Sequence, residues 1–335
     1  MSRSNFQRRG FTLVELLVVI GIIALLVGIL LPTLGRVRGS AQSLKCAANL
    51  RSIGQGIADY LSRHDGVYPP AAFYKGLAFD NVSGQLPTTP SDGYVHWSSF
   101  LYGNRDRAGD ESIYRQLDGW DAFRCPALDN GGLPPANTFA GNNDGYPNES
   151  SGAIDHQAPR LAYTINEALA PRGVFVPFFS DRGNVRVYRF VKGNKIRSPA
   201  STILATEIWG AQDAVLTDSL TGGFDRVSAS RRPVHGFTAG IAGPEQLYKV
   251  PYSAGFIRST SDDVDRDPLT NPGATPTTLL DWVGRNHGPR RKDSRGFDAR
   301  KSNFLYADGH VQTKHVLETL TPFEWGERFY SLERR

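Results

Sequence analysis

The chain has 335 residues, among them 35 Gly and 21 Pro, and its formal net charge is +5. Its length allows one large domain or two ordinary ones, and the surplus of Gly and Pro favours a body rich in loops. The small net charge, without a basic patch interleaved with aromatic residues, argues against nucleic-acid binding. Two cysteines and no CxxC pair exclude a cysteine-rich zinc domain.

The amino-terminal segment predicts a membrane-spanning helix. Residues 1–10 are short, polar and basic, and residues 11–34 are almost entirely apolar. A helix over residues 11–34 would be about 36 Å long, enough to cross a hydrocarbon layer of roughly 30 Å. The arginines before this segment fix the amino terminus in the cytoplasm, so we expect the rest of the chain to be translocated.

Glu15 is the exception inside this apolar segment. A carboxylate within a bilayer costs up to about 3 kcal/mol, so such a residue indicates a function. Cleavage between Gly10 and Phe11 would place Glu15 one helical turn from a new α-amino group, where the amino terminus of a neighbouring subunit could neutralise it. The alternatives are an ordinary secretory signal, cut near residue 35, and a plain membrane anchor, but neither accounts for Glu15.

The sequence GFTLVELLVVIGIIALL resembles the amino terminus of type IV prepilins and type II secretion pseudopilins. The resemblance implies that a prepilin peptidase cuts after Gly10 and methylates Phe11, and that Glu15 acts in assembly. It also implies an inner-membrane protein with one span and a periplasmic body. Its other partners would be the lipid bilayer, further pilin subunits and an inner-membrane assembly platform. After assembly the protein would be part of a filament.

The helix is predicted to continue beyond the membrane. Pro32 would loosen the turn before it, which fits a role in assembly. Apolar residues then recur at intervals of three and four, as on one face of a helix. With Gly66 and the Pro69-Pro70 pair as the stop, we expect an amphipathic continuation over residues 35–65. The predicted apolar stripe consists of Leu34, Val37, Ala41, Leu44, Ala48, Ile53, Ile57 and Leu61.

The remaining chain, residues 66–335, is predicted to be one loop-rich body. Strands are expected at residues 161–166, 184–191 and 201–207, the second with Val185, Val187 and Phe190 on its buried side. Residues 301–316 read as a hairpin that turns at Asp308-Gly309. We therefore expect an α+β, pilin-like fold, in which a long amino-terminal helix packs on an antiparallel β-sheet with long irregular insertions. The predicted divisions are a leader at 1–10, the membrane helix at 11–34, its continuation at 35–65 and the body.

A second resemblance involves both ends of the chain. The segments CAANLRSIGQGIADY, FRCP and NFLYADGHV, with a histidine before the last, are similar to a family of bacterial prepilin-like proteins with a late His-to-Asp-Gly motif. His287 and Asp308 correspond to that motif, although the spacing between them is longer than the family usually shows.

Cys46 lies on the predicted helix and Cys125 in a loop. If the body is outside the cytoplasm, a disulfide could join them and fix the long excursion of the chain to the helix. Two buried free thiols are the alternative.

Two groups of residues could bind a metal. His287, Asp308 and His310, with Glu207 as a fourth ligand, suit a transition metal, although Asp308 is also an ordinary turn residue. The acidic residues from Asp263 to Asp267 alternate as in a calcium loop, but the Gly and Glu that an EF-hand needs are missing. A looser calcium site and a solvated acidic turn therefore both stay open.

We predict a structural subunit, a pseudopilin or minor pilin, without catalytic activity. The sequence has no GxSxG, P-loop or GxGxxG motif, so nucleotide-driven work is left to partners. One alternative is a filament-borne binding module with an exposed aromatic patch around Trp97, Trp120 or Trp209. Another is a membrane-tethered metal-dependent enzyme, which requires the three metal-ligand candidates in one pocket.

Overall fold

The computed structural model divides the chain into two compact units, Met1–Ala41 and Gln42–Arg335. The predicted leader and the cleavage position lie outside the described residues. The structure describes residues 13–74, 94–102, 120–128, 131–132, 137–138, 141–142, 158–171, 187–208, 233–238, 255–264 and 279–333.

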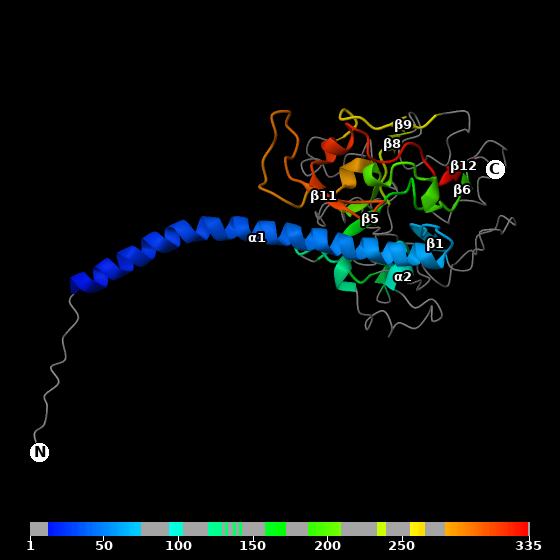
Figure 1. Ribbon diagram of the computed structural model, residues 1–335. Helices are drawn as coiled ribbons and strands as arrows, with labels where there is room; N and C mark the ends of the chain where they lie inside the picture. The colour runs from blue at the N-terminus through cyan, green and yellow to red at the C-terminus, as the bar shows by residue number, and fades with distance from the viewer. Residues whose placement is uncertain are drawn as a thin grey trace, which may run out of the picture. The chain divides into compact units, whose positions relative to one another are not determined.

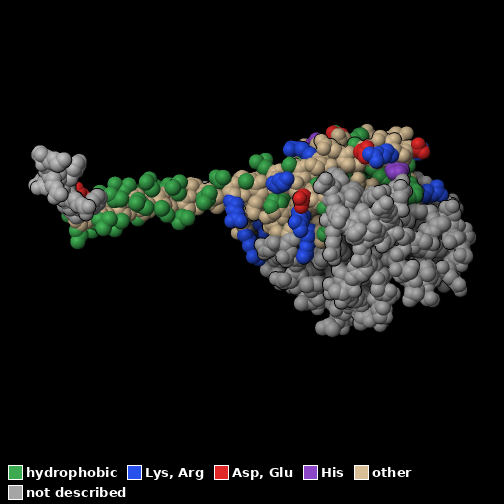
Figure 2. All heavy atoms as spheres, turned by 90° about the horizontal axis from the view of Figure 1, so that it is seen from below, with side chains coloured by type: hydrophobic (Ala, Val, Ile, Leu, Met, Phe, Trp, Pro, Cys, Tyr) green, Lys and Arg blue, Asp and Glu red, His purple; other side chains and the backbone are tan. Residues whose placement is uncertain are grey.

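A single helix, α1 (Leu13–Arg63), begins in the first unit and continues past Pro32 without interruption. Within the first unit its large apolar side chains are exposed on all faces, with exposed fractions from 44% at Val27 to 78% at Leu13. Figure 2 shows one side of this part of the helix, where hydrophobic side chains cover the surface. Among the described residues α1 is the one helix long and apolar enough to cross a membrane, a criterion that a signal sequence also meets. A helix that is apolar all round needs surroundings other than water.

In the second unit one face of α1 is buried. Leu50, Ile53 and Ile57 are at most 1% exposed and lie on one side of the helix, because their spacing matches its turns. The predicted stripe is thus right from Ile53 onward. It is wrong at Leu44, which is 70% exposed, and at the exposed Ala48, because the buried face there consists of Cys46, Ala47 and the polar Asn49 instead.

The helix ends where the sequence predicts. Asp65 and Gly66 have positive φ angles of 50° and 73°. The Gly66 amide donates a hydrogen bond to the Leu61 carbonyl at 2.8 Å, which closes a Schellman-type cap. Gly66 is therefore the conformational stop for α1.

The body is built on a four-stranded antiparallel sheet in the order β11-β10-β7-β5 (Figure 1). This arrangement confirms the α+β class and the predicted hairpin, whose turn contains Gly309 at φ 94°. Every residue of the central strands β7 and β10 is buried. The strands are β5 (Tyr163–Ile165), β7 (Ile203–Glu207), β10 (Ser302–Tyr306) and β11 (Val311–Lys314).

Both faces of this sheet are covered by apolar residues. Leu305 points into a core that contains Leu50, Ile53 and Ile57 of α1, and its neighbours Phe304 and Tyr306 point into a second core with Trp325. Alternation of this kind is the normal period of a strand. Gly54 of α1 lets the helix approach, since a Cβ there would lie 3.0 Å from a Leu305 methyl group.

Shorter elements surround the sheet. A third small apolar cluster, around Phe237 and Phe329, lies beside them. The paired strands are β1 (Ala72–Tyr74) with β2 (Tyr94–His96), β3 (Asn137–Thr138) with β4 (Gly141–Asn142), β6 (Val187–Tyr188) with β12 (Leu332–Glu333), and β8 (Phe237–Thr238) with β9 (Ile257–Arg258). The short helices are α2 (Trp97–Tyr102) and single 3-10 turns at Trp120–Phe123, Gly193–Lys195, Pro199–Ser201, Leu279–Trp282 and Val316–Thr319.

The predictions for the aromatic residues are wrong in two respects and untested in one. Trp97 and Trp120 are only 2% and 8% exposed and belong to the core beside α1, so they do not form an exposed binding patch. Trp209 lies outside the described residues. Phe190, predicted on the buried side of its strand, is 44% exposed because the strand β6 ends two residues before it.

Replacement of Leu305 by Ala should lower the free energy of unfolding by about 2–5 kcal/mol, because the helix–sheet core cannot close the cavity completely. The same change at Leu44, which is exposed, should change it by no more than about 0.5 kcal/mol. Urea denaturation of the detergent-solubilised chain, followed by tryptophan fluorescence, would measure both. Equal effects would contradict the packing of α1 on β10.

Candidate functional site

Glu207 ends β7 and its side chain is fully buried. Its Oε1 atom lies 2.8 Å from His287 Nε2 and accepts a hydrogen bond of 2.8 Å from the Asn303 amide side chain. Its Oε2 atom faces the Asn303 backbone N–H at 3.3 Å and the Ser302 hydroxyl at 3.4 Å. A buried carboxylate needs such donors to offset its lost hydration, so this constellation is built around the carboxylate.

The backbone around His287 fixes its ring beside Glu207. His287 and Lys301 exchange backbone hydrogen bonds of 3.1 and 2.7 Å, and the Gly284 amide donates to the Glu207 carbonyl at 2.7 Å. A Cβ on Gly284 would lie 2.7 Å from the Ile208 carbonyl oxygen, so the close approach of this loop to β7 requires glycine. The pair Glu207–His287, called the dyad below, is therefore rigidly placed.

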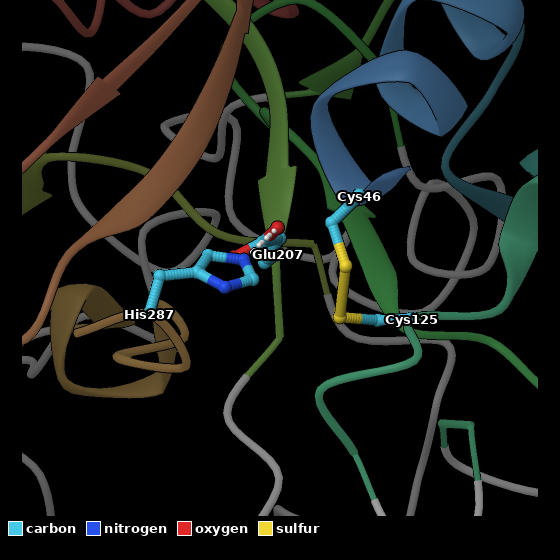
Figure 3. A group of neighbouring side chains, drawn as sticks. All are labelled: Cys46, Cys125, Glu207 and His287. Carbon is cyan, nitrogen blue, oxygen red and sulfur yellow. Dashed lines mark hydrogen bonds and ion pairs between the residues drawn. A yellow bond between two sulfur atoms is a disulfide. The ribbon is translucent and has the colours of Figure 1, made fainter. Parts of the chain in front are cut away.

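A disulfide between Cys46 of α1 and Cys125 lies directly beside the dyad (Figure 3). The two Cα atoms are 5.4 Å apart, and the residues are separated by 79 positions in sequence. Chain entropy predicts that closing such a loop stabilises the fold by about 4 kcal/mol. One potential ligand atom from each of the two cysteines, Glu207 and His287 lies within 4.8 Å of every other.

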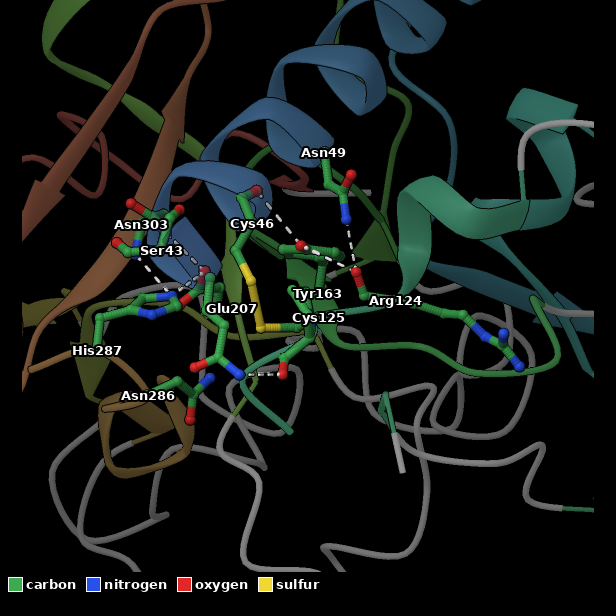
Figure 4. Close-up of a disulfide and its surroundings, with 12 residues drawn as sticks. Ser43, Cys46, Asn49, Arg124, Cys125, Tyr163, Glu207, Asn286, His287 and Asn303 are labelled. Carbon is green, nitrogen blue, oxygen red and sulfur yellow. Dashed lines mark hydrogen bonds and ion pairs between the residues drawn. A yellow bond between two sulfur atoms is a disulfide. The ribbon is translucent and has the colours of Figure 1, made fainter. Parts of the chain in front are cut away.

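Further hydrogen bonds connect the two cysteine segments (Figure 4). Asn49 donates to the Arg124 carbonyl at 2.6 Å, and the Tyr163 hydroxyl lies 3.3 Å from the Cys46 carbonyl oxygen and 3.4 Å from that of Arg124. Burial, reinforced by the negative charge of Glu207, raises the pKa of Tyr163 far above its usual value. The hydroxyl therefore stays protonated and remains a donor.

The structure does not bring His287, Asp308 and His310 into one metal site. His287 pairs with Lys301 before β10, whereas Asp308 follows the other end of that strand, roughly 20 Å away at about 3.3 Å per residue. Asp308 Oδ1 lies 2.6 Å from His310 Nδ1 in a partly exposed turn. Slight burial works against ionisation of Asp308, but the hydrogen bonds from His310 lower its pKa overall.

Of the predicted ligands, only Glu207 and His287 lie next to each other. The sequence did not indicate Asn303 of β10, which donates a hydrogen bond to Glu207. The next residue, Phe304, pairs with Thr206 of β7, so the place of Asn303 beside Glu207 depends on strand register. The predicted acidic loop is described only in part. Asp263 Oδ2 accepts hydrogen bonds from Thr260, and Asp265 and Asp267 lie outside the described residues.

Glu15, predicted to act in assembly, lies on α1, exposed in the first unit, and Gly10 and Phe11 lie outside the described residues. Residues 5–31 match the family model of the prokaryotic N-terminal methylation motif. Neither the curated proteins nor the solved structures gave a match. The motif and the apolar helix on which most of it lies fit a prepilin-type protein, a type IV pilin- or pseudopilin-like precursor. The late His-to-Asp-Gly resemblance lies beyond the matched residues and stays a prediction.

Replacement of His287 by Ala should lower the free energy of unfolding by about 3 kcal/mol, because the buried side chain of Glu207 would lose its partner at 2.8 Å. The matched change His310→Ala removes a partly exposed partner of Asp308 and should cost less than about 1 kcal/mol. Thermal and urea unfolding of both variants would test this. A larger loss for His310→Ala would show that the dyad is not the structural centre.

Proposed function

We propose that this chain is a structural subunit, a pseudopilin or minor pilin, of a type II secretion or type IV pilus-like filament. The observation that carries the proposal is the methylation motif at residues 5–31, most of which lies on the part of α1 that is apolar on all its faces. In the precursor, prepilin peptidase cuts after Gly10 and methylates Phe11. The body stays on the periplasmic side of the inner membrane, while the helix is held in lipid.

The apolar part of α1 explains why such a subunit assembles. Outside the bilayer, large exposed side chains from Leu13 to Leu34 would each face water, at a cost of about 25 cal/mol per Å² of apolar surface. Packing among the same helices of neighbouring subunits removes that surface from water. An inner-membrane assembly platform supplies the work of extraction, and this chain needs no catalytic activity of its own.

Glu15 sets the register of this assembly in the proposal. Its carboxylate sits in an apolar helix and is best stabilised there by a positive charge. The methylated amino group of Phe11 in an adjacent subunit is a charge of the required sign, close to the same level of the helix. Pro32, with no backbone N–H to give, weakens the helix locally and allows it to adjust as subunits pack.

The disulfide supports a location of the body outside the cytoplasm. Disulfides persist in oxidising compartments such as the periplasm and are rare in the reducing cytoplasm. The link between Cys46 and Cys125 therefore agrees with the orientation that the basic leader predicts. The body, Gln42–Arg335, would then be the part of the subunit that faces the filament surface or its partners.

The amino-terminal mass of the protein from its native membranes should correspond to a chain that begins at Phe11 and carries one additional methyl group. Intact-protein mass spectrometry, with peptide sequencing of the first fragment, would measure this. A chain that begins near residue 36 would instead show ordinary signal cleavage, and the filament proposal would then be wrong.

Replacement of Glu15 by Val should leave the subunit in the membrane and lower its amount in the sheared filament fraction by at least about tenfold, the effect of losing a 1.4 kcal/mol interaction. Leu16→Val, next to it in the apolar helix, is the matched control and should assemble normally. Immunoblots of membrane and sheared fractions would compare them. Normal assembly of the Glu15 variant would contradict the role of its carboxylate.

A further inference from the structure

The disulfide and the dyad together have the ligands of a metal site. We propose that, once the disulfide is reduced, Cys46, Cys125, Glu207 and His287 bind one tetrahedral divalent cation of the zinc class. All four residues are buried, and one potential ligand atom from each lies within 4.8 Å of the others (Figure 3). This inference concerns the body alone and does not depend on the filament proposal.

The ligand set matches zinc in chemistry and in size. Two thiolates, an imidazole and a carboxylate are all common zinc ligands. With bonds of about 2.0–2.3 Å, a tetrahedral zinc ion keeps its ligand atoms roughly 3.3–3.8 Å apart. Because His287 Nε2 and Glu207 Oε1 are 2.8 Å apart, they need to separate only slightly to admit the ion between them.

The surroundings already orient two of the ligands. The Asn303 side chain donates to Glu207 Oε1 at 2.8 Å, and the Ser302 hydroxyl lies 3.4 Å from Oε2. The backbone hydrogen bonds between His287 and Lys301 fix the loop that carries the imidazole. Such outer contacts orient metal ligands in proteins, and here they are present with the disulfide intact.

Reduction should leave the two cysteines next to each other, because bonds other than the disulfide connect their segments. Asn49 of α1 donates to the Arg124 carbonyl at 2.6 Å, and Gln42 donates to the Pro126 carbonyl at 2.9 Å. These contacts lie on either side of Cys46 and act on the residues before and after Cys125. The site therefore does not have to be assembled from a separated pair of thiols.

The chemistry balances with a phosphine as the two-electron reductant. The phosphine breaks the S–S bond and, with one water, gives two thiols and a phosphine oxide. Binding of Zn²⁺ then forms two Zn–S bonds and releases the two thiol protons. Since the same sulfur atoms form either the disulfide or the bonds to the ion, the two states exclude each other. The connection between α1 and the Cys125 segment is thus covalent when oxidised and metal-mediated when reduced.

Cobalt(II), added to the full chain in detergent, would test the proposal. After phosphine reduction, one equivalent of Co²⁺ should give thiolate-to-cobalt charge-transfer absorption and tetrahedral ligand-field bands, both removed by Zn²⁺. The oxidised protein should give neither. Absence of these bands in the reduced wild-type protein, whether it is folded or not, would overturn the proposal.

Variants distinguish a site with four ligands from binding by the two cysteine thiols alone. His287→Ala and Glu207→Gln should each weaken Zn²⁺ binding, measured by competition with a chromogenic chelator, by at least about tenfold. The matched control His310→Ala should bind like the wild type. Unchanged affinity in both of these variants would show that the thiols alone hold the ion, and loss of binding in His310→Ala would place the site elsewhere; both results overturn the assignment.

A second measurement does not depend on the folding of any variant. In the reduced wild-type chain, Zn²⁺ should slow alkylation of both Cys46 and Cys125 by iodoacetamide at least tenfold, as followed by peptide mass spectrometry. Protection of one cysteine alone, or of neither, would contradict a shared ion.

Discussion

The buried carboxylate of Glu207 is the constraint around which the body is organised. A carboxylate without access to water must be surrounded by donors, and these come from segments far apart in sequence: Ser302 and Asn303 of β10 and the loop that carries His287. Asn303 also donates to the Ser43 carbonyl of α1. The hydrogen bonds around Glu207 thereby connect helix, sheet and loop. The disulfide between Cys46 and Cys125 adds a covalent bond at the same position.

Helix α1 is one continuous helix whose two parts have surfaces suited to different surroundings. From Leu16 to Leu31 its side chains are apolar in every direction, while in the second unit only the face with Leu50, Ile53 and Ile57 is buried. The difference lies in sequence pattern, because an apolar surface all round suits lipid or other helices and a single stripe suits one packed neighbour. One element therefore carries both the prokaryotic methylation motif and the helical face that packs on the body.

Local patterns allowed most of the fold to be predicted. The helix, its stop at Gly66, strands β5 and β7 and the β10–β11 hairpin each follow from residues close together in sequence. The candidate site could be predicted only in part, since it depends on which strands pair. The sequence predicts Glu207 and His287 as ligands together with Asp308, but Asp308 follows the far end of β10, away from the other two. The burial of Trp97, and of Asn49 in place of Leu44, is likewise decided by tertiary packing rather than by periodicity.

The disulfide also determines how the body responds to mechanical load. A pull along α1 reaches the rest of the body covalently at Cys46, because the S–S bond bypasses the chain between this residue and Cys125. The last turns of α1, up to Arg63, and the chain that follows them are therefore shielded from tension that enters through the helix. Fraying at the cap near Gly66 would not lengthen the mechanical path from helix to sheet. If such a subunit is drawn out of a membrane by its helix, the disulfide keeps the helix covalently connected to the body at Cys46.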